Sequence, residues 1–438
     1  MISMTSSRCR GCPGFGSLWE IDPEGARPGR RITRGAKGES APQFTADGDL
    51  LFLAARPTDE DDKPPKSLWR LPAAGGEAVE VVALPGGVDD DKRLRTARKD
   101  NKVSAVLHEG YPVRHWDHDL GPERAHLFSA ASLADLTPDP GDALRDAAFD
   151  LSRDGAFVVT TWNRPDPGAA LRSTLVRIDV ATARRSVIVD DPEADLGLPA
   201  ISPDGQSVAF TRETLSAPDR APRITLWLLR FGGRPVELTA EWDRWPTSVT
   251  WSADGSSMIV TADDHGRGPI FVVDPATGAA RTVVADDFTY SDVCAAPRGV
   301  LFALRSSYAT PQHPVRIDAD GSVTVLPCVA MPALPGTLTE VSATADDGRT
   351  IRSWLVLPDR RDDRILGRKP RHVWRGEPIP SVAGRQAGGQ SGRACWSMYC
   401  LVIDRGAPPQ ETAKWDGDQR WPRMRARTHG PVNSRRTV

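Results

Sequence analysis

Ten residues, Ile201-Ser202-Pro203-Asp204-Gly205-Gln206-Ser207-Val208-Ala209-Phe210, decide the fold, because their pattern recurs along the chain. The first half returns fifty residues away on either side, as Leu151-Ser152-Arg153-Asp154-Gly155 and as Trp251-Ser252-Ala253-Asp254-Gly255. Phe44-Thr45-Ala46-Asp47-Gly48 is a more distant copy, and Ala296-Pro297-Arg298-Gly299-Val300 is a degenerate one. Repeats of this length are typical of stacked supersecondary units.

The chemistry of one repeat explains its length. In Ser202-Pro203-Asp204-Gly205, proline presets φ at the second position of a type I turn, and glycine takes the left-handed conformation at the fourth. This predicts a tight hairpin between two strands. Residues 226–229 and 236–239 then supply a third and a fourth strand. Four antiparallel strands in about fifty residues predict one blade of a β-propeller.

The number of repeats predicts the size of the propeller. Complete repeats span residues 41–82, 145–190, 195–239, 246–284 and 289–326, and incomplete ones lie near 18–33 and 83–137. We therefore predict an all-β protein, with a seven-bladed type of β-propeller over residues 18–330 that has two incomplete blades. Residues 1–17 are predicted to be irregular. The missing inner strands would leave unpaired sheet edges.

Charge divides the chain into two parts. The net charge of the 438 residues is −2. Residues 360–438 contain 17 Lys and Arg against 7 Asp and Glu, or +10, which leaves 39 against 51, or −12, for residues 1–359. The nearly neutral total favours neither a nucleic-acid nor a membrane partner. The first nineteen residues lack the apolar core of a signal peptide, so we expect a cytoplasmic protein whose six cysteines form no structural disulfides.

The strand order assigns the loops to two faces of the predicted disc. Turns between the first and second and between the third and fourth strands share one face. Loops between the second and third strands share the other face with the crossovers between blades. The long insertions all belong to the second kind, so we expect any functional site on that face. These insertions are residues 54–67, 163–172, 213–223 and 241–246.

Several longer blocks resemble the propeller of bacterial acylaminoacyl-peptidase-like members of the prolyl oligopeptidase family of serine peptidases. The resemblance covers about residues 17–358. Its blocks are Ala36-Lys37-Gly38-Glu39-Ser40-Ala41-Pro42, residues 97–105, residues 108–119, Trp242-Asp243-Arg244-Trp245-Pro246 and Gly336-Thr337-Leu338-Thr339-Glu340.

The resemblance implies that an α/β-hydrolase domain follows the propeller and cleaves short peptides with a Ser-Asp-His triad, while the propeller restricts access. Residues 338–358 resemble the first hairpin of that domain, within the segment 331–359, and the resemblance then stops. Peptides or a hydrolase domain are thus the implied partners. The alternative is a non-catalytic propeller that binds peptides or a partner protein, and a decayed product without activity is a third interpretation.

The residues after the hairpin lack the expected catalytic machinery. A nucleophile elbow needs Gly-x-Ser-x-Gly, because its sharp turn tolerates only small neighbours. Gly388-Gly389-Gln390-Ser391-Gly392 has the wrong spacing, and the late histidines His372 and His429 lie outside apolar segments. We therefore predict no catalytic residue in this chain and no peptidase activity.

Residues 360–438 form a basic tail without a period of 3.6 or 2, and we expect them to be largely disordered. A shift of reading frame, as in a truncated or pseudogene product, would explain this composition. A nucleic-acid-binding tail is the functional alternative.

The remaining candidate residues are binding groups. Asp243 and Arg244, between Trp242 and Trp245 at a blade crossover, rank first for binding a substrate or partner, with a salt bridge packed under the tryptophans as the structural alternative. His115 and Asp117 are candidates for contact with a peptide or with the hydrolase domain. The spacing of Cys9 and Cys12 lacks a second pair at a zinc-ribbon distance, so we predict neither a metal nor a cofactor.

Overall fold

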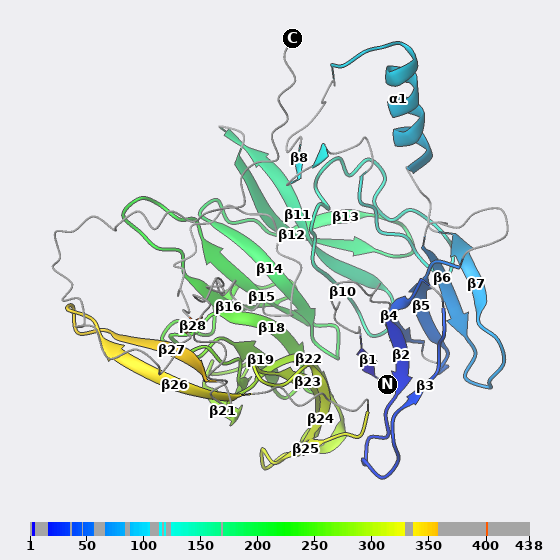
Figure 1. The fold of residues 1–438 in the computed structure, drawn as a ribbon. Helices are drawn as coiled ribbons and strands as arrows, with labels where there is room; N and C mark the ends of the chain where they lie inside the picture. The colour runs from blue at the N-terminus through cyan, green and yellow to red at the C-terminus, as the bar shows by residue number, and fades with distance from the viewer. Residues whose placement is uncertain are drawn as a thin grey trace, which may run out of the picture.

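The chain folds as an all-β propeller. The computed structural model describes residues 2–4, 16–35, 37–45, 47–56, 66–83, 88–105, 114–115, 118–119, 124–167, 170–328, 336–357 and 400–401. Successive antiparallel sheets stand side by side around the molecule, from the N-terminal sheets through the centre of the chain to β25 (Figure 1). Within the described residues, no helix is long and apolar enough to cross a membrane.

Five sheets have the four strands of a complete blade, in the simple order of the sequence. The first contains β4 (Glu39–Phe44), β5 (Leu50–Ala54), β6 (Ser67–Leu71) and β7 (Val79–Ala83). The second contains β10 (Phe149–Leu151), β11 (Phe157–Asp166), β12 (Ala170–Asp179) and β13 (Arg185–Val189), and the third contains β14 (Ala194–Ile201), β15 (Ser207–Thr214), β16 (Ile224–Arg230) and β17 (Val236–Glu237). The fourth contains β18 (Pro246–Trp251), β19 (Met258–Ala262), β20 (Ile270–Val273) and β21 (Ala280–Val284), and the fifth contains β22 (Thr289–Ala295), β23 (Leu301–Ser306), β24 (His313–Ile317) and β25 (Val323–Val325).

The predicted plan of seven blades is corrected to five blades in the described part of the chain. The first predicted fragment is a three-stranded sheet of β1 (Ile2–Met4), β2 (Ser17–Glu20) and β3 (Arg30–Arg31). The second retains an outer hairpin, in which Phe128 pairs with Asp135. Helix α1 (Val88–Asp100) precedes it, and β8 (Arg114–His115) pairs with β9 (His118–Asp119). Within the described residues, neither fragment has the four strands that a blade requires.

The repeated turns have the predicted chemistry. Gly205 has φ of 68°, and its N–H donates to the carbonyl oxygen of Ser202 over 2.8 Å. The Asp204 carboxylate accepts hydrogen bonds from the Ser202 hydroxyl and from the Gln206 N–H. The equivalent bonds recur around Asp254, and they lower the pKa of Asp254 to about 2. Serine and aspartate thus fix each hairpin from inside, which explains why both residues recur with the glycine.

Neighbouring blades pack through their apolar faces, and side-chain hydrogen bonds also join them. Val159 and Leu175 of the second blade pack against Leu196 and Val208 of the third. The Trp251 indole N–H donates to the Ala200 carbonyl oxygen of the preceding blade over 2.9 Å. The interfaces are therefore continuous cores from one sheet to the next.

The two ends of the propeller also meet. The Gly29 N–H donates to the carbonyl oxygen of Pro327 over 2.9 Å, and Arg316 of β24 forms an ion pair of 2.6 Å with Glu24. In Figure 1 the loop between β2 and β3 accordingly lies beside β25. The incomplete N-terminal sheet thus occupies the position next to the fifth blade.

Two turn glycines lie against the preceding blade. Gly278 has φ of 74°, and a Cβ atom there would overlap the carbonyl oxygen of Leu238. Gly321, at the equivalent turn of the fifth blade, approaches the Val283 carbonyl oxygen in the same way. Glycine at these positions therefore serves the backbone conformation and the blade interface together.

We predict that Gly278→Ala destabilises the propeller more than Gly155→Ala. Both glycines have positive φ, but a Cβ at Gly155 would meet nothing within 4 Å. The backbone strain alone should cost about 1 kcal/mol in either variant. The overlap with Leu238 should add about 1–3 kcal/mol to the loss in free energy of unfolding for Gly278→Ala. Urea denaturation measures the difference, and equal losses would contradict the close approach.

Candidate functional site

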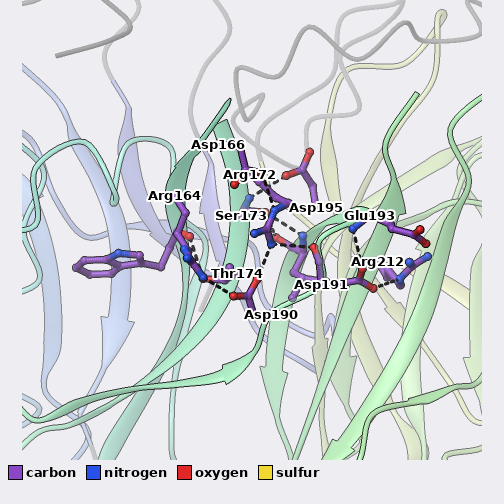
Figure 2. A network of polar contacts seen from close by, with 12 residues as sticks. Arg164, Asp166, Arg172, Ser173, Thr174, Asp190, Asp191, Glu193, Asp195 and Arg212 are labelled. Carbon is purple, nitrogen blue, oxygen red and sulfur yellow. Dashed lines mark hydrogen bonds and ion pairs between the residues drawn. The ribbon is translucent and has the colours of Figure 1, made fainter. Parts of the chain in front are cut away.

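We call the face that carries the crossovers and the loops between second and third strands the loop face. Two groups of polar side chains lie on it. Figure 2 shows the largest group, where the second blade meets the third. Arg172 stands at its centre, with only 7% of its side chain exposed. Its guanidinium contacts the Asp166 carboxylate at 2.8 Å, the Asp190 carboxylate at 2.5 Å and the Asp191 carbonyl oxygen at 2.8 Å.

Local structure brings these groups together. Asp166 ends β11 and pairs with Ala170, while Arg172 is the third residue of β12 and pairs with Arg164, so Asp166 and Arg172 are diagonal neighbours in one hairpin. Asp190 and Asp191 form the crossover from β13 to β14. Arg164 forms a second ion pair with Asp190 and is more exposed than Arg172. Arg172 therefore joins the loop of one blade to the crossover that begins the next.

The neighbouring blade completes the network. The Arg212 Nε atom of β15 lies 2.6 Å from the Asp191 carboxylate. The Ser173 N–H donates to the Asp195 carboxylate (Figure 2). The Ser173 hydroxyl donates to the Leu196 carbonyl oxygen over 2.6 Å. Because its hydroxyl is bonded to the backbone, Ser173 has the environment of a structural residue, not of an activated nucleophile.

The pKa values of the acidic groups in this network shift in opposite directions. Burial opposes ionisation of Asp191, but hydrogen bonds from Arg212 and from the Glu193 N–H outweigh it and lower the pKa of Asp191. Burial dominates at Asp195 and raises its pKa, although the Ser173 N–H bond opposes this shift. The arrangement is therefore suited to holding two blades in register by charge.

A second group on the loop face binds the hairpin that follows the propeller. This hairpin consists of β26 (Thr337–Thr344) and β27 (Thr350–Leu357), and β28 (Cys400–Leu401) pairs with β27 in parallel. Arg267, in the loop between β19 and β20, contacts Glu340 of β26 and Asp287 of the next crossover, each at 2.7 Å. Its guanidinium also lies 4.9 Å from the ring centroid of Trp354 on β27.

Arg267 repeats the role of Arg172. Arg172 lies near the start of a third strand and Arg267 in the loop before one, and each pairs with an aspartate of the crossover to the next blade. Sequence reasoning missed both residues. The available signal was the Asp-Asp pair that follows the fourth strand of two blades, at residues 190–191 and 286–287.

The residues predicted for binding have different positions. The Trp242 ring packs edge-on against Phe271 at 4.9 Å and is part of the interior. Asp243 is fully exposed, while Arg244 contacts the Asp264 carboxylate at 2.9 Å and lies 3.9 Å from the Asp243 carboxylate. The Arg244 guanidinium also donates to the Asp243 carbonyl oxygen. The structure thus places Arg244 with a partner that the sequence did not suggest.

Of the other predicted groups, only the backbone of His115 and β28 lie within the described residues. His115 belongs to the backbone of β8, whereas Asp117, Cys9, Cys12 and the tail, apart from β28, lie outside the described residues. No group of three or more potential metal-binding side chains occurs within the described ranges.

We predict that Arg172→Met lowers the free energy of unfolding by about 2 kcal/mol, because it removes a guanidinium that is only 7% exposed and makes charge-assisted hydrogen bonds to two partly exposed carboxylates. Arg164→Met removes an exposed partner of the same Asp190 and should cost less than about 1 kcal/mol. Chemical denaturation of both variants measures the contrast. Similar losses would show that burial of Arg172 is not what makes the network strong.

The chain is similar in sequence and in fold to proteins that are called peptidases. No protein-family model matches the chain. The chain is 27% identical over 235 residues to dipeptidyl-peptidase 5 of Trichophyton schoenleinii, a match that covers 46% of this chain and 32% of the relative. Dipeptidyl-peptidase 5 of Aspergillus fumigatus is 28% identical over 225 residues, with 43% and 30% covered. The matches thus span about a third of the length of these relatives.

The fold comparison agrees. Acylaminoacyl peptidase of Pyrococcus horikoshii matches with a TM-score of 0.53 at 11% identity, covering 80% of this chain and 56% of the other. A complex of acylaminoacyl peptidase with Z-Gly-Gly-Phe-chloromethyl ketone matches with a TM-score of 0.52 at 9% identity, covering 79% and 56%. Sequence relatives and shared fold together show that this chain carries a β-propeller of the type found in the prolyl oligopeptidase family of peptidases.

Proposed function

We propose that this propeller is the access-limiting domain of a serine peptidase and that its loop face is the seat of the hydrolase domain. One observation carries the proposal. The hairpin of β26 and β27, whose sequence resembles the start of a hydrolase domain, is anchored on the loop face by side chains of two blades.

The anchor combines charge with aromatic packing. Glu340 binds Arg267 at 2.7 Å through one carboxylate oxygen and Arg352 of β27 at 2.6 Å through the other. Trp354 is buried between the Arg267 guanidinium and the Tyr308 ring, whose centroid is 5.7 Å away. Since Arg267 and Tyr308 come from loops of the fourth and fifth blades, the hairpin bridges two blades. A domain that begins with this hairpin would therefore start directly over the loop face.

The relatives support peptides as the substrate class of such an assembly. The matching proteins from Trichophyton and Aspergillus are called dipeptidyl-peptidases. Asp243, fully exposed at a crossover beside Arg244, is on the loop face and would contact a peptide or the hydrolase domain. His115 and Asp117 remain candidates for the same contact. A propeller that binds peptides without cleaving them is the alternative.

We further propose that this polypeptide itself does not cleave peptides. Triad enzymes join an activated serine to a preorganised oxyanion hole, and removing the triad costs roughly a millionfold in turnover. The sequence after residue 358 contains no Gly-x-Ser-x-Gly. Binding alone does not compensate, because binding substrate and transition state equally does not accelerate the chemical step.

The purified chain should release no product from acyl-peptide or chromogenic aminoacyl substrates above the buffer blank, and a fluorophosphonate probe should leave it unlabelled. Stoichiometric labelling of one serine, abolished when that serine is changed to alanine, would contradict this expectation. An active prolyl-oligopeptidase-type enzyme, assayed in parallel, shows that substrates and probe are competent.

The proposed seat has its own test. Arg267→Ala should free the hairpin, so that residues 337–357 gain amide hydrogen exchange while the blades keep their protection, because the variant removes both the ion pair to Glu340 and the contact with Trp354. Arg223→Ala removes a loop-face arginine that binds Glu237 instead and should leave the hairpin protected. Unchanged exchange in Arg267→Ala would argue against the anchor.

A further inference from the structure

A buried histidine closes the base of the loop that holds Trp354. His313 begins β24 opposite Arg305 of β23 and is only 4% exposed. The Arg305 Nε–H points to the His313 Nε2 atom at 3.0 Å, and the His313 Nδ1 atom lies 2.9 Å from the Pro311 carbonyl oxygen. Because arginine only donates, Nε2 must accept and Nδ1 must carry the hydrogen that is donated to Pro311. Both bonds therefore require one neutral tautomer of His313.

The charged and titratable groups around His313 favour this neutral form. Arg305, on the adjacent strand, faces it directly and also pairs with Asp286 at 3.2 Å. Asp286 is further engaged by the buried Tyr290 hydroxyl, which donates to it over 2.8 Å. The Phe288 ring covers the remaining side, edge-on to the imidazole. The nearest carboxylate of this cluster is thus bound to Arg305 and to Tyr290, while the nearest charge is positive.

Protonation would break this arrangement. A hydrogen on Nε2 would remove the acceptor of Arg305 and place two cations side by side in a buried site. Burial lowers the pKa of His313 from its ordinary 6.5, the Pro311 bond opposes this shift, and the Arg305 charge adds a smaller lowering. We call the arrangement with both His313 hydrogen bonds the closed state. Because the pKa of His313 is lowered in it, the closed state is fully favoured above pH 6.5, and its stability relative to an open state falls as the pH drops below this value.

His313 is connected to the hairpin through one loop. Residues 307–312 join β23 to β24, so the pair of Arg305 and His313 forms the two ends of this loop. Ser307 and Thr310 bond each other's backbone in a tight turn that carries Tyr308. The Tyr308 ring packs on Trp354 of β27. Opening the base of the loop would therefore remove one side of the Trp354 anchor.

We propose that His313 is an acid-sensitive switch, whose protonation opens the loop 307–312 and loosens the hairpin of β26 and β27 from the loop face. Between pH 6.5 and the point at which His313 titrates in the closed state, only the open state takes up the proton. The equilibrium constant for opening then increases about tenfold for each unit by which the pH falls.

Hydrogen exchange of the full chain between pH 7 and pH 5 tests the switch. After correction for the intrinsic exchange rate, protection of residues 307–312 and 337–357 should fall about tenfold per pH unit below pH 6.5. His313→Gln, which cannot gain a charge, should abolish this dependence. His265→Gln removes an exposed loop-face histidine and should retain it.

A second measurement keeps the test decisive if His313→Gln fails to fold. The imidazole resonances of His313 in the unmodified chain should titrate below pH 6.5. Titration at or above 6.5 would overturn the proposal, and so would constant protection in the unmodified chain or a retained dependence in folded His313→Gln.

Discussion

Each sheet of a propeller has two apolar faces, and each face must be covered by another sheet. This constraint governs the rest of the structure. Where two complete blades meet, residues such as Val159, Leu196 and Val208 are almost fully buried. The described residues of the incomplete repeat before the second blade cover part of that blade's face, where Leu136 packs on Val176 and Ile178. On inner strand β10, Phe149 and Leu151 remain more than half exposed. The apolar core is thus most complete where blade follows blade, and the loop-face networks lie in that part.

The polar groups of the loop face follow from the same constraint. Stacking fixes the distance between blades but leaves them free to slide, since apolar contact has no direction. Arg172 and Arg267 each bind a loop and a crossover, so charge supplies the direction that packing lacks. The hairpin adds a partner to one of these arginines, because Glu340 binds Arg267 beside its crossover partner Asp287. The proposed site for a following domain thus uses the same kind of arginine–carboxylate ion pair that joins the blades.

The sequence predicted the parts of this structure that local chemistry determines. Serine, aspartate and glycine of the repeated turns act within six residues, so their pattern fixes each hairpin and, through its spacing, the blades. Arg172, Gly278 and His313 acquire their roles from partners on other strands or blades, and a pattern in one segment does not reveal these. The two repeats that the sequence showed to be incomplete form, in the described residues, a three-stranded sheet and an outer hairpin, so the plan of seven gives five complete blades. Trp242 packs against the core, although its neighbour Asp243 is exposed, so the sequence of this segment did not reveal the position of the tryptophan.

The meeting of the two ends affects how the chain reaches its fold. Arg316 contacts Glu24 and the Pro23 carbonyl oxygen across more than 290 positions of sequence. Contacts of such long range form late, because they require the loop between them to be closed first. During synthesis, the N-terminal sheet must therefore wait for the fifth blade to emerge before it gains this neighbour. Its final docking thus depends on the last part of the propeller to be translated, whereas each central blade needs only the repeat beside it.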